Sequence, residues 1–220
     1  MDKKKRRQQK SGTHGLVTIP SFKLSALAIA IHFVSSAVHA GPEGGQVTGG
    51  RGNIASTGTT TTIEQLSDRM AIDWQSYDVG ANERVHYIQP DSSSISLNRI
   101  LSNSGSQIHG QIDANGHVIL MNPHGVVFGA GATINVGGLL ASGLNIEADS
   151  FMNGDFAFSA LENAEGKVIN SGLINATTGG SVTLLGTQVE NNDLMVANLG
   201  RVNLAAGKQA VVTIMKVSWG

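Results

Sequence analysis

The side chains best suited to metal or acid–base chemistry are spread along the sequence. His109, His117 and His124 follow one another at intervals of eight and seven residues, and the sequence contains no cysteine. Zinc-binding pairs of histidine or cysteine are usually separated by only about two to five residues. We therefore expect these histidines to lie in solvent or at turns, and we predict neither a metal nor a cofactor.

Two aspartates give the strongest indication of an enzyme. Asp91 and Asp113 are 22 residues apart, so they would stack on one face of a protein built from coils of that length. However, Asp113 lies in the turn sequence Asp-Ala-Asn-Gly, and a glycosidase needs a supported pair of carboxylates at a defined separation. A secreted enzyme that degrades polysaccharides is therefore the alternative interpretation, and we assign no catalytic residue.

Charge is distributed unevenly along the 220 residues. Residues 1–40 carry seven basic side chains and one acid, a charge of +6, while the whole chain has a net charge of −1. The remaining 180 residues therefore carry −7. Such a body lacks the excess of basic residues that nucleic-acid binding requires, so we expect no nucleic-acid partner.

The first forty residues have the pattern of an extended secretory signal peptide. The basic start, MDKKKRRQQK, precedes an apolar run of about a dozen residues, too short for a comfortable membrane span. Val38 and Ala40 occupy the −3 and −1 positions of a cleavage site. A nuclear-type basic tag or a membrane anchor is the alternative. We predict that residues 1–40 are removed and that the mature chain starts near Gly41.

Very short apolar runs, separated by Gly, Asn and Ser, characterise the chain from residue 95 onward. Most are three or four residues long, whereas strands usually have about five or six. Short strands with frequent corners are typical of a coil that turns repeatedly around one core. The runs are 95–97, 108–112, 118–121, 126–128, 134–136 and 139–140. Further upstream, we predict short strands at 59–62 and 71–79, with Trp74 and Tyr77 in a core or a capping layer.

An internal repeat supports the same interpretation. Residues 168–188 align with 189–209, so that Val168 matches Val189 and Asn170 matches Asn191. With a slip of one residue, the pair Val182 and Leu184 matches Val202 and Leu204. A period of about 20 residues without a helical half-repeat predicts an all-β chain folded as a parallel β-helix.

The sequence Asn122-Pro123-His124-Gly125-Val126 lies between two apolar runs. Proline has no N–H for a strand ladder and forces the preceding residue into an extended conformation. Asparagine can hydrogen-bond to the backbone of its own turn, and glycine tolerates a positive φ. The motif therefore predicts a corner of the coil, although any turn of a β-protein would satisfy it when taken alone.

Several motifs in a fixed order resemble the amino-terminal secretion domain of the filamentous haemagglutinin family, the exoproteins of bacterial two-partner secretion. The resemblance covers about residues 46–210, and Asn122–Val126 falls where the family has Asn-Pro-Asn-Gly-Ile. The second family motif, Asn-Pro-Asn-Leu, is absent, and residues 98–106 occupy its place, as in the adhesin-like branch. The matching segments are 72–80, 85–90, 96–100, 106–142 and the coils up to 209.

The resemblance implies a fold and a role. It implies a right-handed parallel β-helix with an amino-terminal cap and small extra-helical antiparallel sheets. It further implies that residues 41–210 form a secretion and folding-nucleation domain of an adhesin, which the POTRA domains of an outer-membrane transporter recognise in the periplasm of a Gram-negative bacterium. The product would be secreted or displayed at the cell surface, and downstream cargo would bind a host or bacterial receptor.

The resemblance also directs attention to particular residues. We expect the transporter to recognise the corner motif Asn122–Val126 together with Asn98 and Arg99, and changes at Asn122 or around Asn98–Arg99 to impair secretion more than stability. Residues 211–220 would be the end of the domain or a truncated continuation. A short autonomous adhesin remains a third interpretation.

Overall fold

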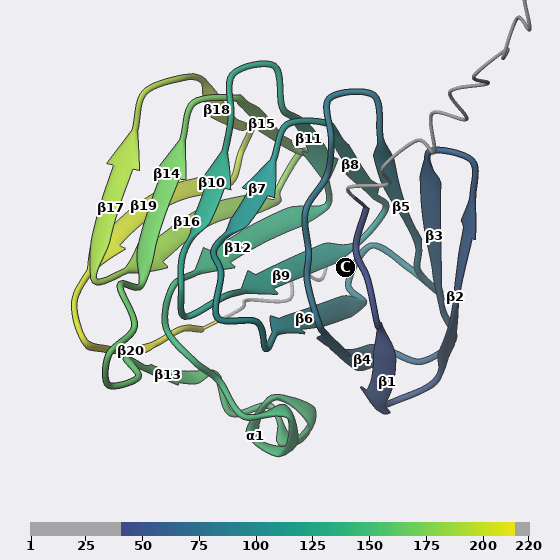
Figure 1. Cartoon of the computed structure of the whole chain (residues 1–220), viewed down its shortest axis with the longest axis horizontal. Coiled ribbons are helices and arrows are strands. Elements are labelled where there is room, and N and C mark those ends of the chain that lie inside the picture. The colour runs from purple at the N-terminus through teal and green to yellow at the C-terminus, as the bar shows by residue number, and fades with distance from the viewer. Residues whose placement is uncertain (1–40, 214–220) are drawn as a thin grey trace, which may run out of the picture. The chain divides into compact units, whose positions relative to one another are not determined.

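The structure, a computed structural model, describes residues 41–213. The predicted signal peptide and cleavage site lie outside the described residues, so they stay predictions. Within the described residues, strands dominate and one short helix is present (Figure 1). None of the described helices is long and apolar enough to cross a membrane.

Three sheets form the walls of a parallel β-helix, and the chain passes from one sheet to the next in every coil (Figure 1). Sheet 1 consists of β1 (Gln46–Gly49), β4 (Arg69–Trp74), β6 (Ile95–Ile100), β9 (His117–Met121), β12 (Gly138–Ser142), β16 (Ser181–Gly186) and β19 (Arg201–Ala206). Sheet 2 consists of β7 (Ser106–Ile108), β10 (Val126–Phe128), β14 (Lys167–Asn170) and β17 (Gln188–Asn191). Sheet 3 consists of β2 (Gly52–Thr57), β3 (Thr60–Gln65), β5 (Arg84–Ile88), β8 (Gln111–Ala114), β11 (Thr133–Val136), β15 (Leu173–Ala176) and β18 (Met195–Ala197).

The strand register confirms the repeat that the sequence predicts. Val168 pairs with Val189 between β14 and β17, and Val182 pairs with Val202 between β16 and β19. The slip of one residue is therefore real, because the two sheets repeat at 21 and 20 residues. In this repeat, valine stacks on valine in both sheets, and an apolar core runs along the inside of all three sheets.

Two predicted strands are shorter than expected. The run at 108–112 is not one strand, because Ile108 ends β7 and β8 begins at Gln111 after a corner. The predicted strand at 71–79 ends with β4 at Trp74, and Val79 makes only an isolated bridge to Ile108. In both cases, the polar or glycine residues inside the apolar run mark the corner.

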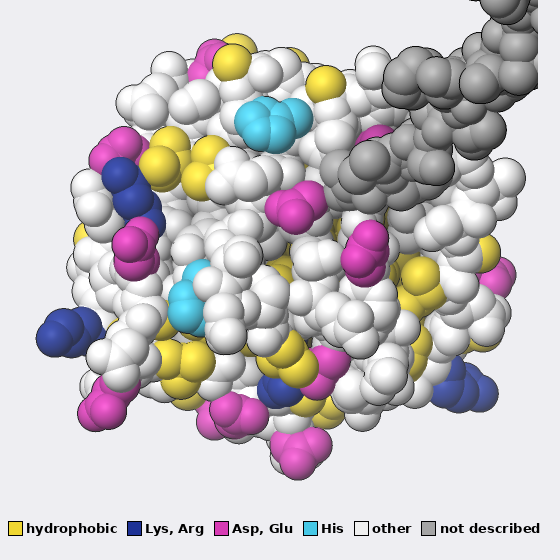
Figure 2. Space-filling model, viewed as in Figure 1, with side chains coloured by type: hydrophobic (Ala, Val, Ile, Leu, Met, Phe, Trp, Pro, Cys, Tyr) yellow, Lys and Arg dark blue, Asp and Glu magenta, His cyan; other side chains and the backbone are white. Residues whose placement is uncertain are grey.

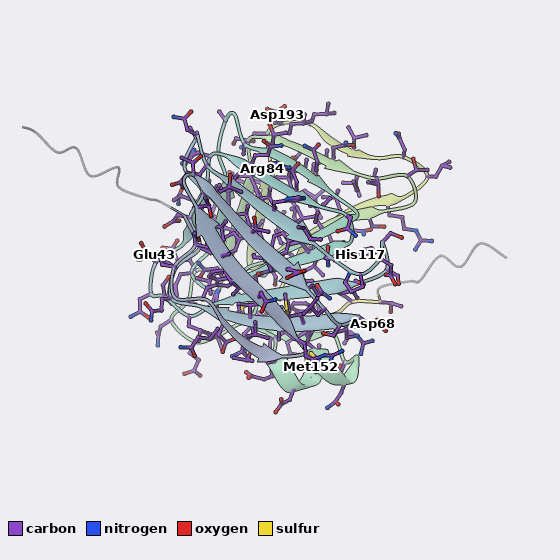
Figure 3. All side chains as sticks on the ribbon, turned by 90° about the vertical axis from the view of Figure 1, so that its right-hand side faces the viewer. Glu43, Asp68, Arg84, His117, Met152 and Asp193 are labelled. Atoms are coloured by element: carbon purple, nitrogen blue, oxygen red, sulfur yellow. The ribbon has the colours of Figure 1, made fainter. Side chains whose placement is uncertain are left out.

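One end of the β-helix is closed by antiparallel pairing. Strands β2 and β3 form a hairpin at the edge of sheet 3, and β1 pairs antiparallel with β4. Trp74 and Tyr77 are buried beneath this cap with their rings edge to face, 5.4 Å apart. Figure 3 views the molecule with this end toward the reader. The expectations of a cap and of a core position for both aromatic residues are confirmed.

An insertion after β12 covers part of the outer face of sheet 1. It contains α1 (Ala148–Asn153) and β13 (Ala157–Ser159), which pairs antiparallel with β20 (Gln209–Val211). Phe151, Phe156 and Phe158 form a second apolar cluster against the outward side chains of sheet 1. The small antiparallel sheet confirms the expectation from the resemblance, whereas the helix was not predicted.

Candidate functional site

The corner motif lies between β9 of sheet 1 and β10 of sheet 2. The side chain of Asn122 is fully buried, and its Oδ1 accepts a hydrogen bond of 2.9 Å from the backbone N–H of His124. Its Nδ2 donates to the carbonyl of Ser104 at 3.0 Å and to Oγ of Ser106 at 3.1 Å. Asn122 therefore holds its own turn and ties it to the preceding coil, which confirms the corner interpretation.

The second half of the motif contacts the following coil. Gly125 has a φ of +109° and donates its N–H to the carbonyl of Asn122 at 2.9 Å. A Cβ at this position would lie 2.8 Å from the carbonyl oxygen of Lys167. The carbonyl of Pro123 accepts a hydrogen bond of 2.8 Å from Gly166. Since Gly166 and Lys167 are where the chain returns from the insertion, the corner holds that return in place.

Asn98 lies on β6 and points into the β-helix. Its Oδ1 accepts hydrogen bonds from Nε1 of Trp74 at 3.0 Å and from the hydroxyl of Tyr87 at 2.9 Å. Its Nδ2 donates to the carbonyl of Ile119 at 3.2 Å, and the Tyr77 and Tyr87 hydroxyls are 2.7 Å apart. Because burial strongly disfavours a phenolate, the pKa of both tyrosines is raised well above the usual value near 10. This polar cluster stabilises the capped end of the core.

Arg99 points to the opposite side of β6, as successive strand residues do. Its guanidinium forms a bidentate pair with Asp73, with Nε–Oδ1 and Nη2–Oδ2 distances of 2.8 and 3.1 Å. Nη1 also lies 3.3 Å from a carboxylate oxygen of Glu147, which immediately precedes α1. Arg99 thus links two strands of sheet 1 to the start of the insertion.

The predicted site residues therefore do not form one surface. Asn122 and Asn98 are buried, Val126 is buried in β10, and Arg99 lies outside sheet 1. Breaking the buried hydrogen bonds of Asn98 or Asn122 costs stability, and whether changes there affect export even more stays a prediction. Their contribution to transporter recognition stays a prediction, and it concerns the chain before it folds.

The two aspartates considered for catalysis do not stack. Asp113 pairs in register with His86, and its carboxylate lies 2.6 Å from Nε of Arg84. Asp91 lies beyond the end of β5, where its Oδ1 accepts hydrogen bonds from Ser93 and Ser94. The Ser93 hydroxyl and the other turn hydrogen bonds lower the pKa of Asp91. The stacking expected from their 22-residue spacing is therefore wrong.

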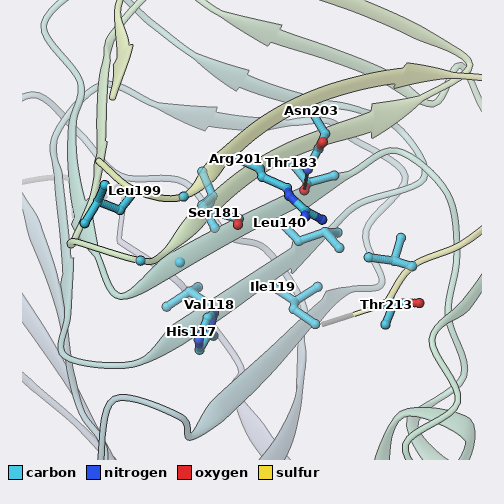
Figure 4. A pocket seen from close by; sticks show the side chains of 15 residues that line it. His117, Val118, Ile119, Leu140, Ser181, Thr183, Leu199, Arg201, Asn203 and Thr213 are labelled. Carbon is cyan, nitrogen blue, oxygen red and sulfur yellow. Dashed lines mark hydrogen bonds between the residues drawn. The ribbon is translucent and has the colours of Figure 1, made fainter. Parts of the chain in front are cut away.

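A groove of about 270 Å³ remains open on the outer face of sheet 1 (Figure 4). His117 and Arg201 line it from β9 and β19, with Ser181 and Thr183 between them on β16. Desolvation by burial lowers the pKa of His117. No group of three or more metal-binding side chains occurs among the described residues, and on the face shown in Figure 2 charged side chains are dispersed rather than gathered in one patch.

Comparisons with known proteins agree with this architecture. The family model of the TPS secretion domain matches residues 38–217. A heme/hemopexin-binding protein of Haemophilus influenzae is 38% identical over 181 residues, which are 79% of this chain and 20% of that protein. A second protein of that name from the same species is 41% identical over 103 residues, covering 47% of this chain and 11% of the relative. This chain therefore spans a fifth or less of the length of these relatives.

A solved structure shows the same fold. The crystal structure of the HMW1 secretion domain from Haemophilus influenzae matches with a TM-score of 0.75 and 34% sequence identity. The match covers 78% of this chain and 46% of the HMW1 chain. From the coils, the cap and these matches, we conclude that the chain belongs to the TPS secretion domain family.

Proposed function

We propose that residues 41–210 are the amino-terminal secretion and folding-nucleation domain of a haemagglutinin-like exoprotein. The proposed partner is the set of POTRA domains of an outer-membrane transporter, met in the periplasm on the way to secretion or the cell surface. Family membership supports the secretion role. The difference between the two ends of the β-helix supports the folding role.

The end of the β-helix opposite the cap exposes its core. Val182 and Leu184 on β16 have no exposed surface, yet their partners Val202 and Leu204 on β19 are 41% and 50% exposed. Figure 1 shows β17 and β19 at this end and β2 at the other. The exposed apolar side chains of β19 continue the rows of the buried core. Covering them with a further coil would remove apolar surface from water and is therefore favourable. This observation carries the proposal that downstream coils fold onto the domain.

For most of the chain, the transporter would have to bind before the domain folds. In the folded domain, the strands between residues 95 and 142 pair on both sides, except β7 at the edge of sheet 2. Their backbone groups are therefore unavailable to a partner strand. We propose that residues 46–63 and 95–142 are recognised while extended, because extended segments add to sheet edges through main-chain hydrogen bonds.

The folding role is tested by blocking the open end. In a fusion of this chain to further β-helical coils, Val202→Lys and Leu204→Lys should slow the appearance of protease-resistant downstream coils after dilution from urea. Asn203→Lys is the matched control, since its side chain faces outward and donates to Oγ1 of Thr183. Equal rates for the inward and outward variants would contradict nucleation at this end.

We propose no enzymatic activity. The carboxylate of Asp113 is engaged by Arg84, Gln111 and Asn135, and that of Asp91 by its own turn. A glycosidase needs two supported carboxyl groups on either side of one bond, about 5 to 9.5 Å apart. Asp113 has no carboxylate partner at its register positions, where His86 and Asn135 stand in the neighbouring strands.

A further inference from the structure

The outer edge of the cap hairpin has main-chain groups without a neighbouring strand among the described residues. Strand β2 is the last strand of sheet 3 and pairs only with β3. Leu66 donates its N–H to the carbonyl of Arg51 at 2.8 Å. Arg51 and Leu66 are therefore a hydrogen-bonded residue pair of the antiparallel ladder. Antiparallel ladders alternate, so the N–H and C=O groups of Gly52, Ile54 and Ser56 point away from β3.

This edge lacks the usual protection against pairing. The strand reads Gly-Asn-Ile-Ala-Ser-Thr, with neither proline nor charge, and four of its six residues are exposed. Natural proteins blunt open edges with charged residues, proline or bulges. The other edges at this end are poorer templates, since β1 contains an irregular register at Val47–Gly49 and β7 has three residues, with the N–H of Gln107 taken by Asp78.

The hairpin is also the most local element of the cap. Its strands are joined by the two residues Gly58 and Thr59, and Gly58 has a φ of +56°. Contacts between near neighbours form without the cost of closing long loops. An isolated hairpin is marginally stable in water and gains stability when a third strand is added. The hairpin is therefore able to present its edge before the β-helix is complete.

We propose that the free edge of β2, centred on Ile54 and Ser56, is a docking strand for an extended strand of the transporter's periplasmic domains. This inference rests on the proposed function and names the contact within it. Pairing at the cap leaves the opposite end of the β-helix open for downstream coils. A six-residue strand pair buries less than the roughly 1,200 Å² typical of stable complexes. Such a small contact suits transient binding to a transporter, which must release the chain, better than a stable dimer of two copies of this chain.

A proline at Ser56 tests the edge directly. Proline is tolerated on an edge strand where the N–H faces away from the ladder, so Ser56→Pro should leave the melting temperature within a few degrees of the wild type. It should weaken binding of the chain to the purified periplasmic domains of the transporter by about tenfold or more. Ser56→Ala is the matched control, because it also removes the 3.1 Å contact between the Ser56 and Thr61 hydroxyls but keeps the N–H. Ser56→Ala should bind like the wild type.

Hydrogen exchange on the unaltered chain provides a second measurement that needs no variant. The amides of Ile54 and Ser56 should exchange rapidly in the free chain and slowly once the periplasmic domains are added. The amide of Ala55, which faces β3, should be protected in both states. Protection of Ser56 that grows with chain concentration alone would identify a second copy as the occupant and overturn the proposal.

The possible failures are distinguishable. If the wild type binds and Ser56→Pro binds equally well without a change in exchange at Ser56, the docking edge is wrong and the secretion role stands. If the wild type neither binds the periplasmic domains nor is exported, the proposed function itself is wrong.

Discussion

At the scale of single residues, neighbours along one strand serve different purposes. Asn98 satisfies the polar groups of a buried aromatic cluster, while Arg99 ties the outer face of sheet 1 to Asp73 and Glu147. The sequence identified Asn98 and Arg99 as candidate positions but did not show in which direction each side chain points. Alternation along a strand would have shown that the two side chains face opposite ways, whereas the partners of Asn98 come from other coils and depend on the register between them.

Replacing Asn98 with leucine should strongly destabilise the domain. The change leaves the indole N–H of Trp74 and the hydroxyl of Tyr87 without their buried acceptor, and each such loss costs about 1–3 kcal/mol. We expect the free energy of unfolding to fall by about 3 kcal/mol in urea titrations. Asn203→Leu on the exposed face of β19 is the control and should change it by less than about 0.5 kcal/mol. A small loss for Asn98→Leu would mean that the cluster does not stabilise the cap.

At the scale of elements, the short apolar runs and the repeat predicted most strands of the three sheets. The breaker residues at 122–125 predicted a corner because proline and glycine impose local backbone geometry. The helix α1 was missed because it is one short turn-like segment whose packing depends on Phe151 meeting the outer face of sheet 1. Such a contact between distant segments leaves no periodic signal in the sequence.

Gly125→Val should destabilise the corner through backbone strain and through a steric clash. The control Gly131→Val tests the strain alone. The positive φ of +109° strains any residue with a side chain, and the added Cβ would meet the Lys167 carbonyl at 2.8 Å. Gly131 also has a positive φ, of +94°, but nothing lies within 4 Å of a Cβ there. We expect a loss of about 1–3 kcal/mol from strain in both variants and a larger total loss for Gly125→Val. Equal urea midpoints for Gly125→Val and the wild type would contradict the corner interpretation.

At the scale of the whole described domain, the two ends of the β-helix differ in kind. The cap closes the core with the β2–β3 hairpin and the Trp74 cluster, whereas β19 leaves Val202 and Leu204 half exposed. This difference supports the proposal that folding extends away from the cap. If the cap leaves the transporter before the rest of the chain, each new coil can pack against a coil that has already folded.

The most direct test of the secretion role is export of the full chain from cells that carry or lack the proposed outer-membrane transporter. We predict that the chain reaches the medium only when the transporter is present, and that replacing residues 95–142 with a neutral linker abolishes export. Gly131→Val, which strains the fold outside the corner motif but keeps the extended segment, should still be exported. Export without the transporter, or undiminished export after the linker replacement, would contradict the account.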